Sequence, residues 1–100
     1  MKQGKIMRAL VLALAVSPAF AQTATTAPPS GRLLASNCFQ CHGTNGSGGI
    51  ERLAGESVSE IYNELKEMQR KSPPKMMDMH ARGFTDAELK LIANYFASQR

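Results

Sequence analysis

The sequence predicts an all-α fold of three to five helices. Two long segments carry apolar residues at helical spacing, one over residues 57–70 and one from residue 85 to the end of the chain. Each of them opens with a capping-box pattern, a Ser or Thr followed three residues later by Glu. No segment alternates apolar and polar residues over the length of a strand, and this absence completes the argument for an all-α chain.

Residues 1–21 are predicted to be a secretory signal peptide. Three cations within the first eight residues precede the apolar run 9–16, and Ala19-Phe20-Ala21 matches a cleavage site before Gln22. The run is too short for a membrane anchor, which needs about 20 apolar residues, so no integral span is expected after cleavage. Without this leader, nine Lys and Arg remain against eight Asp and Glu, a balance that gives no support to nucleic-acid binding.

The rest of the chain is expected to be a flexible segment, residues 22–29, followed by one domain over residues 30–100. The flexible segment is rich in Thr, Ala and Pro and has no periodicity. A domain this small buries only about 60% of its unfolded surface and needs an additional staple. A disulfide across Cys-x-x-Cys would close a tiny loop and would constrain the unfolded chain little.

The first helix is expected to run from Gly31 to Cys38, with Ser30 as its N-cap, directly into Cys38-x-x-Cys41-His42. This order of residues is typical of covalent c-type haem attachment, in which each thiol adds to a vinyl group and the imidazole binds iron. One covalent haem c would also supply the missing core. In bacteria this attachment takes place outside the cytoplasmic membrane, which agrees with the leader and predicts a periplasmic protein.

Two other chemistries could use the same cysteines. A dithiol oxidoreductase expects a strand–helix context and gives no role to the adjoining histidine. A zinc site made by Cys38, Cys41, His42 and His80 is disfavoured because His42 follows Cys41 directly and is badly placed to share a tetrahedral site with both thiolates.

The segment 43–49 has four glycines in seven residues, which predicts a tight loop without regular structure. A phosphate-binding loop would need a following Lys-Ser/Thr and a helix, and neither is present. The helix over 57–70 begins at the capping box of Ser57 and Glu60. Its apolar stripe comprises Val58, Ile61, Tyr62, Leu65 and Met68.

Pro73-Pro74 stops that helix, and we expect the following segment, 75–80, to be a loop. It holds half of the methionines of the chain, and thioether sulfur is a soft iron ligand. The candidates for a second axial ligand are Met76, Met77, Met79 and His80. Ligation by His and Met favours electron transfer, whereas a haem enzyme such as a peroxidase needs an open distal position.

The last helix is expected to start after Thr85, which forms a capping box with Glu88, and to run to the end of the chain. Phe84 and Leu89 fit a hydrophobic staple across its start. The buried stripe of this helix is predicted to comprise Leu89, Ile92, Ala93 and Phe96.

Over residues 31–98 the chain resembles the small bacterial class I cytochromes c, and within them most closely the haem subunits of flavocytochrome c sulfide dehydrogenase. The motifs are Cys38-Phe39-Gln40-Cys41-His42-Gly43-Thr44, Leu53-Ala54-Gly55, Met77-x-x-x-Ala81-Arg82-Gly83-Phe84-Thr85-Asp86-x-Glu88 and Ile92-Ala93-Asn94-Tyr95-Phe96-Ala97. The haem motif is shared by all c-type cytochromes, and the stretch that begins at Met77 is the more specific part.

The resemblance implies the class I cytochrome c fold, with His42 as the proximal and Met77 as the distal iron ligand. It also implies that the terminal helices cross, so that Gly31 or Leu34 meets Tyr95 or Phe96. The residues expected to line the haem are Leu53, Tyr62, Leu65 and Ile92. Arg52 and Arg82 are candidates to face the propionates, although the interpretation as a solvated surface arginine is favoured for each.

The implied function is electron transfer with no substrate site of its own. The partner would be an FAD-bearing flavoprotein subunit that oxidises sulfide, or another redox protein if the chain is a freely diffusing shuttle. One feature departs from the family: relatives carry a Pro in the loop after the haem motif whose carbonyl receives the proximal imidazole N–H, and residues 47–52 contain none. The carbonyl that orients His42 is therefore left open by the sequence.

Overall fold

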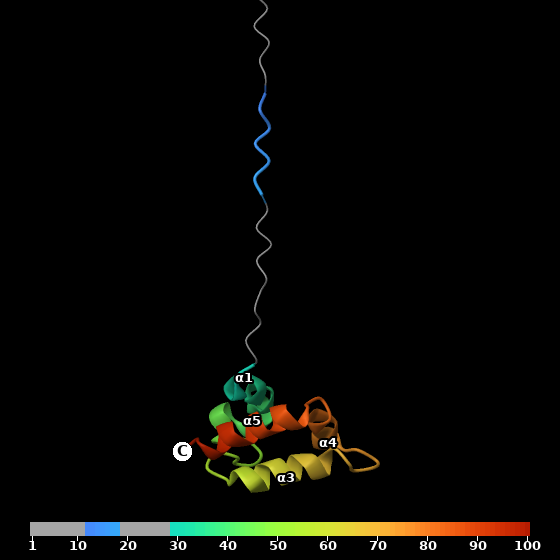
Figure 1. The fold of residues 1–100 in the computed structure, drawn as a ribbon. Coiled ribbons are helices and arrows are strands. Elements are labelled where there is room, and N and C mark those ends of the chain that lie inside the picture. The colour runs from blue at the N-terminus through green and yellow to red at the C-terminus, as the bar shows by residue number, and fades with distance from the viewer. Residues whose placement is uncertain (1–11, 19–28) are drawn as a thin grey trace, which may run out of the picture.

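The computed structural model of the chain describes residues 12–18 and 29–100 (Figure 1). Much of the predicted signal peptide and of the predicted flexible segment lies outside these residues, and residues 12–18 form no helix or strand. The elements are α1 (Gly31–Ala35), η1 (Ser36–Cys38), α2 (Phe39–His42), η2 (Thr44–Gly46), α3 (Val58–Met68), α4 (Met76–Ala81) and α5 (Asp86–Ala97). No strand occurs in the described part of the chain, so the prediction of an all-α fold is confirmed.

The first helical stretch crosses the last helix at very close range. Ser30 caps α1 by accepting the Leu33 N–H at 3.2 Å. A Cβ atom on Gly31 would lie 2.6 Å from the carbonyl oxygen of Leu91 and 3.3 Å from Cβ of Tyr95, both on α5. Only a residue without a side chain fits there, so the expected meeting of Gly31 with Tyr95 is confirmed.

The loop after the haem motif contains one short 3₁₀ turn, η2, where the sequence predicted no regular structure. Its glycines still explain its shape, because Gly46 and Gly49 have positive φ angles of 75° and 73°. A Cβ atom on Gly46 would lie 2.7 Å from the Phe96 ring. The Gly46 carbonyl accepts the Leu53 N–H at 2.9 Å, which closes the loop against the core.

Helix α3 starts where the sequence predicts and ends at Met68, two residues before the expected Arg70. Ser57 accepts the Glu60 N–H at 3.2 Å. In a capping box the Glu60 carboxylate would accept the backbone N–H of Ser57. Here the carboxylate accepts from the Ser57 hydroxyl instead, at 2.9 Å.

The prediction of a loop over residues 75–80 is wrong, because residues 76–81 form helix α4. The Asp78 carboxylate accepts the backbone N–H of Lys75 at 2.7 Å and so satisfies a donor at the helix start. The Met79 N–H bonds to the Lys75 carbonyl at 3.0 Å and continues the turn. Met and Ala are good helix formers, and the preceding prolines lie before the helix, where they cannot interrupt its bonding.

Helix α5 begins with a complete capping box. The Glu88 N–H bonds to the Thr85 hydroxyl at 3.2 Å, and the Thr85 N–H bonds to the Glu88 carboxylate at 2.8 Å. The helix ends at Ala97, three residues before the end of the chain. Its buried face meets α1 and α3 in the core, a cluster that comprises Leu34, Ala35, Ile61, Ile92, Ala93 and Phe96.

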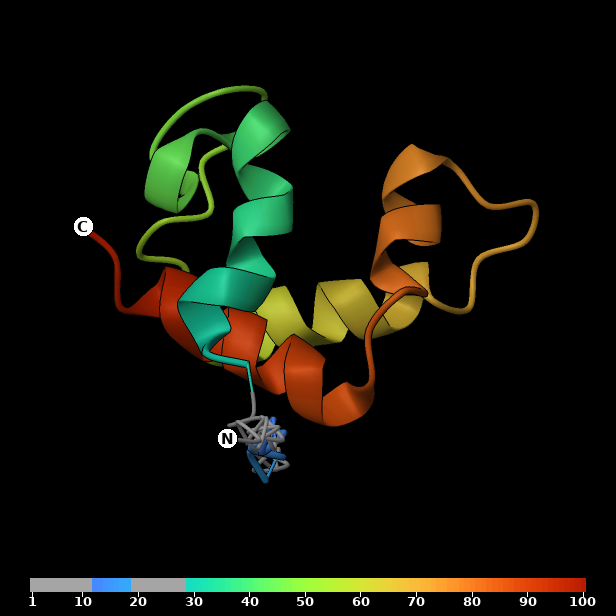
Figure 2. The same ribbon diagram turned by 90° about the horizontal axis from the view of Figure 1, so that it is seen from above.

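Helices α3 and α5 together support two groups of residues that stand apart. The views agree that α1 and α2 lie toward one end of α5, whereas α4 lies at the other side, next to the C-terminal end of α3 (Figures 1 and 2). Helix α4 packs chiefly on α3. This arrangement separates the Cys-x-x-Cys-His motif from the methionine-rich helix, and residues of both line one pocket.

Candidate functional site

Two adjoining pockets form one cleft, and they share Cys38, His42, Glu51 and Met77 as lining residues. Their empty volumes, with the open mouths included, are about 480 Å³ and about 800 Å³. The apolar wall of the first pocket comprises Leu53, Ile61, Leu65, Met68, Ile92 and Phe96. Apolar side chains from α3 and α5 thus form the floor of the cleft.

Cys38 and Cys41 both line the second pocket, and neither is in a disulfide. Cys38 ends η1 and is half-buried, whereas Cys41 lies on α2 and is exposed. Burial raises the pKa of the Cys38 thiol. The two sulfur atoms are therefore presented to the same space, where one ligand could bond to both.

His42 is buried, with 7% of its surface exposed, and its ring has a fixed orientation. Its Nδ1–H donates to the backbone carbonyl of Glu51 at 2.9 Å, which leaves Nε2 as the nitrogen available to a metal. The carbonyl is held in place by the hydrogen bonds of its own loop, since the Ile50 N–H bonds to the Cys41 carbonyl at 2.7 Å. Glu51 thus provides the orienting carbonyl that the sequence could not identify.

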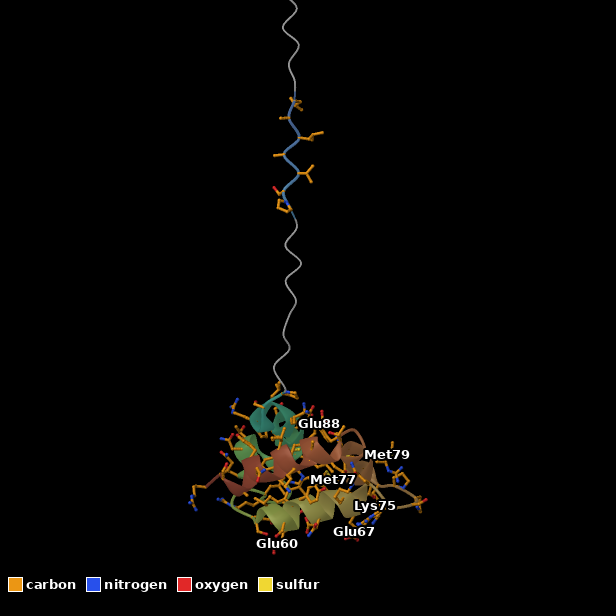
Figure 3. All side chains as sticks on the ribbon, in the orientation of Figure 1. Glu60, Glu67, Lys75, Met77, Met79 and Glu88 are labelled. Carbon is orange, nitrogen blue, oxygen red and sulfur yellow. The ribbon has the colours of Figure 1, made fainter. Side chains whose placement is uncertain are left out.

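All four candidate distal ligands lie on α4, but they differ in placement. Met77 is half-buried and lines both pockets. Met76 is 72% exposed and lines only the second pocket, as does the exposed His80. Met79 is 57% exposed and lines neither, and Figure 3 shows it near the outer edge of the domain, while Met77 lies farther inside. Among the four, Met77 is best placed to face His42 across the cleft.

The structure places some of the remaining predicted site residues at the pockets and others away from them. Leu53, Leu65 and Ile92 line the first pocket. Tyr62 lines neither pocket and packs half-buried against the core, with Lys90 Nζ 6.0 Å from its ring centre. The sequence did not single out Ile61, Met68 or Phe96 as pocket residues, although all three belong to its predicted apolar stripes.

The two candidate arginines do not line the pockets either. Arg52 donates from Nε to the carbonyl of Ala54 at 3.3 Å, and Arg82 donates from Nε to the carbonyl of Gln69 at 3.3 Å. Both guanidinium groups are thus engaged by backbone oxygens.

One edge of the first pocket is acidic, because Glu51 and Glu64 line it. Partial burial raises the pKa of nearby Glu56, and repulsion by Glu64, Glu51 and Glu60 raises it further. Sequence reasoning did not place any of these carboxylates at the pocket.

The residues that the structure describes contain no group of three or more His, Cys, Asp or Glu side chains able to hold a metal ion. The zinc site considered from the sequence is therefore not assembled there. Within the same residues, no helix is long and apolar enough to cross a membrane.

Comparisons with known proteins match this chain to cytochromes. The family model described as cytochrome C oxidase, cbb3-type, subunit III matches residues 26–96. The chain is also 33% identical over 104 residues to the cytochrome subunit of sulfide dehydrogenase from Chlorobaculum tepidum, a match that covers 93% of this chain and 94% of that protein.

Proposed function

The chain belongs to the cytochrome c family, and from this premise we propose that it is a periplasmic electron carrier with one covalent haem c. Cys38 and Cys41 would form the two thioether bonds, His42 would bind the iron through Nε2, and Met77 would be the second axial ligand. Residues 1–21 would direct export and be removed.

The residues of the cleft fit this cofactor. Two free thiols line the same pocket, and His42 is held in the tautomer that a metal requires by its bond to the Glu51 carbonyl. The floor is apolar, as the faces of a porphyrin need. A bound haem supplies one-electron redox chemistry, and ligation by His and Met raises its potential and fills both axial positions.

The observation that carries the proposal is the convergence of Cys38, His42 and Met77 on one apolar cleft from helices that stand apart in the fold. A dithiol oxidoreductase would need the two thiols but would give no role to an oriented, buried imidazole or to a thioether across the cleft. The convergence therefore favours electron transfer by a ligated haem.

The partner we propose is an FAD-bearing sulfide dehydrogenase chain that passes its electrons to this haem. The proposal rests on the relative from Chlorobaculum tepidum, which is a cytochrome subunit of sulfide dehydrogenase and matches this chain over almost its whole length. The mouth of the second pocket suits such a contact, because Ile50 and Met76 line it and are 84% and 72% exposed.

Spectra of the periplasmic fraction, oxidised and reduced, test the cofactor. We expect a c-type haem spectrum whose pigment stays with the polypeptide in acidified organic solvent, and a colourless chain or an extractable pigment would refute the proposal. The partner is tested by purification from the native host. A larger flavin-bearing chain that co-purifies and reduces the haem on addition of sulfide supports the subunit, whereas a lone monomer supports a freely diffusing shuttle.

A further inference from the structure

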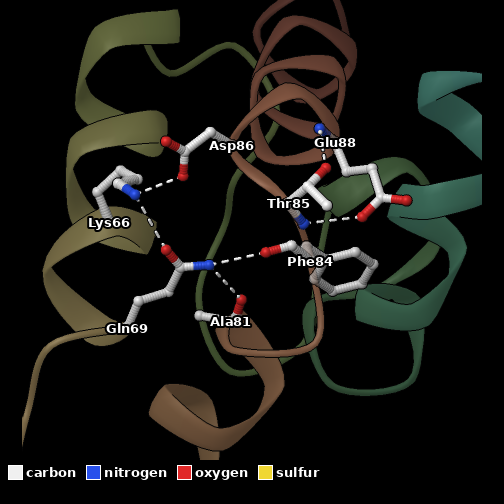
Figure 4. A network of polar contacts seen from close by, with 7 residues as sticks. All are labelled: Lys66, Gln69, Ala81, Phe84, Thr85, Asp86 and Glu88. Carbon is white, nitrogen blue, oxygen red and sulfur yellow. Dashed lines mark hydrogen bonds and ion pairs between the residues drawn. The ribbon is translucent and has the colours of Figure 1, made fainter.

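Gln69 links the end of α3 to the segment that follows α4 (Figure 4). Its side-chain amide donates two hydrogen bonds, to the carbonyl of Ala81 at 2.9 Å and to the carbonyl of Phe84 at 2.9 Å. Its oxygen accepts from Lys66 Nζ at 3.2 Å, and Lys66 also pairs with Asp86 at the start of α5. Every polar atom of the carboxamide is thus engaged, and Gln69 itself is the C-cap residue directly after α3.

A second set of bonds runs in the opposite direction. Arg82, the residue after α4, donates from Nε to the backbone carbonyl of Gln69 at 3.3 Å and from Nη2 to the carbonyl of Lys71. The C-terminal ends of α3 and α4 are therefore cross-linked by side chains from both sides. We call the side-chain bonds of Gln69 and Arg82 the α3–α4 clamp.

The clamp matters because α4 has few other attachments. It packs chiefly on α3, and the cleft separates it from α2, the helix that carries His42. Met77 lies in the first turn of α4, so any movement of this helix relative to α3 changes the position of its sulfur atom in the cleft. If the side-chain amide were removed, the Phe84 carbonyl would lose the hydrogen bond that Gln69 donates, whereas the Ala81 carbonyl would keep the Phe84 N–H at 3.3 Å. A polar group without a partner in a half-buried place is costly.

We propose that Gln69 is the positioning residue for Met77: its carboxamide holds α4 where the thioether can bind the haem iron. This inference rests on the proposed function, because it requires Met77 as the distal ligand. Weakening the clamp is expected to let Met77 leave the iron more often and external ligands replace it. The clamp would thereby set the strength of distal ligation without any contact to the haem.

The test is Gln69→Glu in the haem-loaded protein. At neutral pH the introduced carboxylate faces the two carbonyl oxygens and donates to neither. We expect the thioether–iron charge-transfer band of the ferric protein to weaken, and cyanide to bind about tenfold or more tightly, because α4 loses hydrogen bonds that hold Met77 in place and the thioether leaves the iron more often. Acidification protonates the carboxylate and restores one donor, so the band should recover, whereas general destabilisation would weaken it further.

Two further variants accompany Gln69→Glu, one as a control and one as a substitute. Asp86→Asn removes the ion pair to Lys66 but leaves both carbonyl bonds of Gln69, so the band and the cyanide affinity should match the parent. Gln69→Leu removes the donors without adding charge, and it replaces Gln69→Glu if that variant does not fold. A folded Gln69 variant whose band and cyanide affinity stay within twofold of the parent overturns the inference.

The parent protein and Met77→Ala separate the two proposals. If the parent lacks the charge-transfer band, or Met77→Ala keeps it, the assignment of Met77 fails and the role of Gln69 falls with it. If the parent has the band, Met77→Ala loses it and the Gln69 variants do not change it, the ligand assignment stands and only the positioning role is overturned.

Discussion

At the scale of single residues, the orientation of His42 depends on one carbonyl, that of Glu51, and on the glycines that bring it near. Gly49 lies where a Cβ atom would be 1.9 Å from the carbonyl oxygen of Cys41. The loop can therefore turn back toward the imidazole only if this residue has no side chain. Gly48, its neighbour, has nothing within 4 Å of the corresponding position.

Gly49→Ala should therefore destabilise the protein by at least about 2 kcal/mol, because it combines a left-handed backbone with a clash against backbone atoms. Gly48→Ala is the matched control and should change the free energy of unfolding by less than about 0.5 kcal/mol. Urea unfolding of the haem-loaded variants measures both, and equal stabilities would show that the loop is not held as described.

The distal ligand gives the second prediction at this scale. Met77→Ala should abolish the thioether–iron charge-transfer band and lower the reduction potential, because the thioether is lost as an axial ligand. Met76→Ala and Met79→Ala, at the exposed positions of α4, should retain the band. Visible spectroscopy and redox titration distinguish the three, and a band that disappears in either control instead would move the ligand there.

Sequence reasoning reaches furthest where the chemistry is local, although the roles of Cys38, Cys41 and His42 stay predictions. The roles proposed for Cys38, Cys41 and His42 follow from residue types at fixed spacing, which a sequence displays directly. The role of Glu51 could not be found in this way, since every residue has a carbonyl and only the loop geometry selects one. Gln69 was missed for a similar reason, because its partners are backbone oxygens 12 and 15 residues away.

At the scale of the elements, the starts of the two long helices were predictable from the sequence. The presence of the short helix α4 was not. The Ser57 and Thr85 caps were correct because capping depends on a few adjacent residues. The segment 75–80 was expected to be a loop because Pro73-Pro74 ends the preceding helix, yet the end of one helix does not determine the conformation of the next residues. The bond from the Lys75 N–H to the Asp78 carboxylate lies at the start of the new helix.

The crossing of α1 and α5 allows a prediction at this scale. Gly31→Ala should cost about 1–3 kcal/mol, because the new methyl group would overlap the Leu91 carbonyl and force the helices apart. Asn94→Ala, an exposed position on α5, is the control and should leave stability nearly unchanged. Chemical unfolding measures both, and a Gly31→Ala variant as stable as the control would contradict the close approach.

At the scale of the whole molecule, the proposed haem would complete the interior. The buried cluster consists of six residues, and much of the remaining apolar surface of α3 and α5 faces the cleft. A chain of this size needs an additional source of buried surface to be stable. The haem is thus expected to act as both the redox centre and the largest part of the core.

The double variant Cys38→Ala/Cys41→Ala should accordingly yield little folded protein. Without covalent attachment, the haem is held only by its axial ligands and by apolar contacts, and the empty cleft leaves the helices poorly supported. Circular dichroism should show most of the helical signal lost relative to the haem-loaded parent. A double variant that keeps the helix content and the unfolding midpoint of the parent would show that the polypeptide folds without help.

The attachment of α4 by one interface also has an evolutionary consequence. Because this helix packs chiefly on α3, substitutions between the two prolines and the start of α5 can alter the distal side without disturbing the crossing of α1 and α5. Substitutions within this short segment could therefore change the redox properties of the proposed haem over evolution, while the cysteine motif and the crossing of α1 and α5 stay under separate selection.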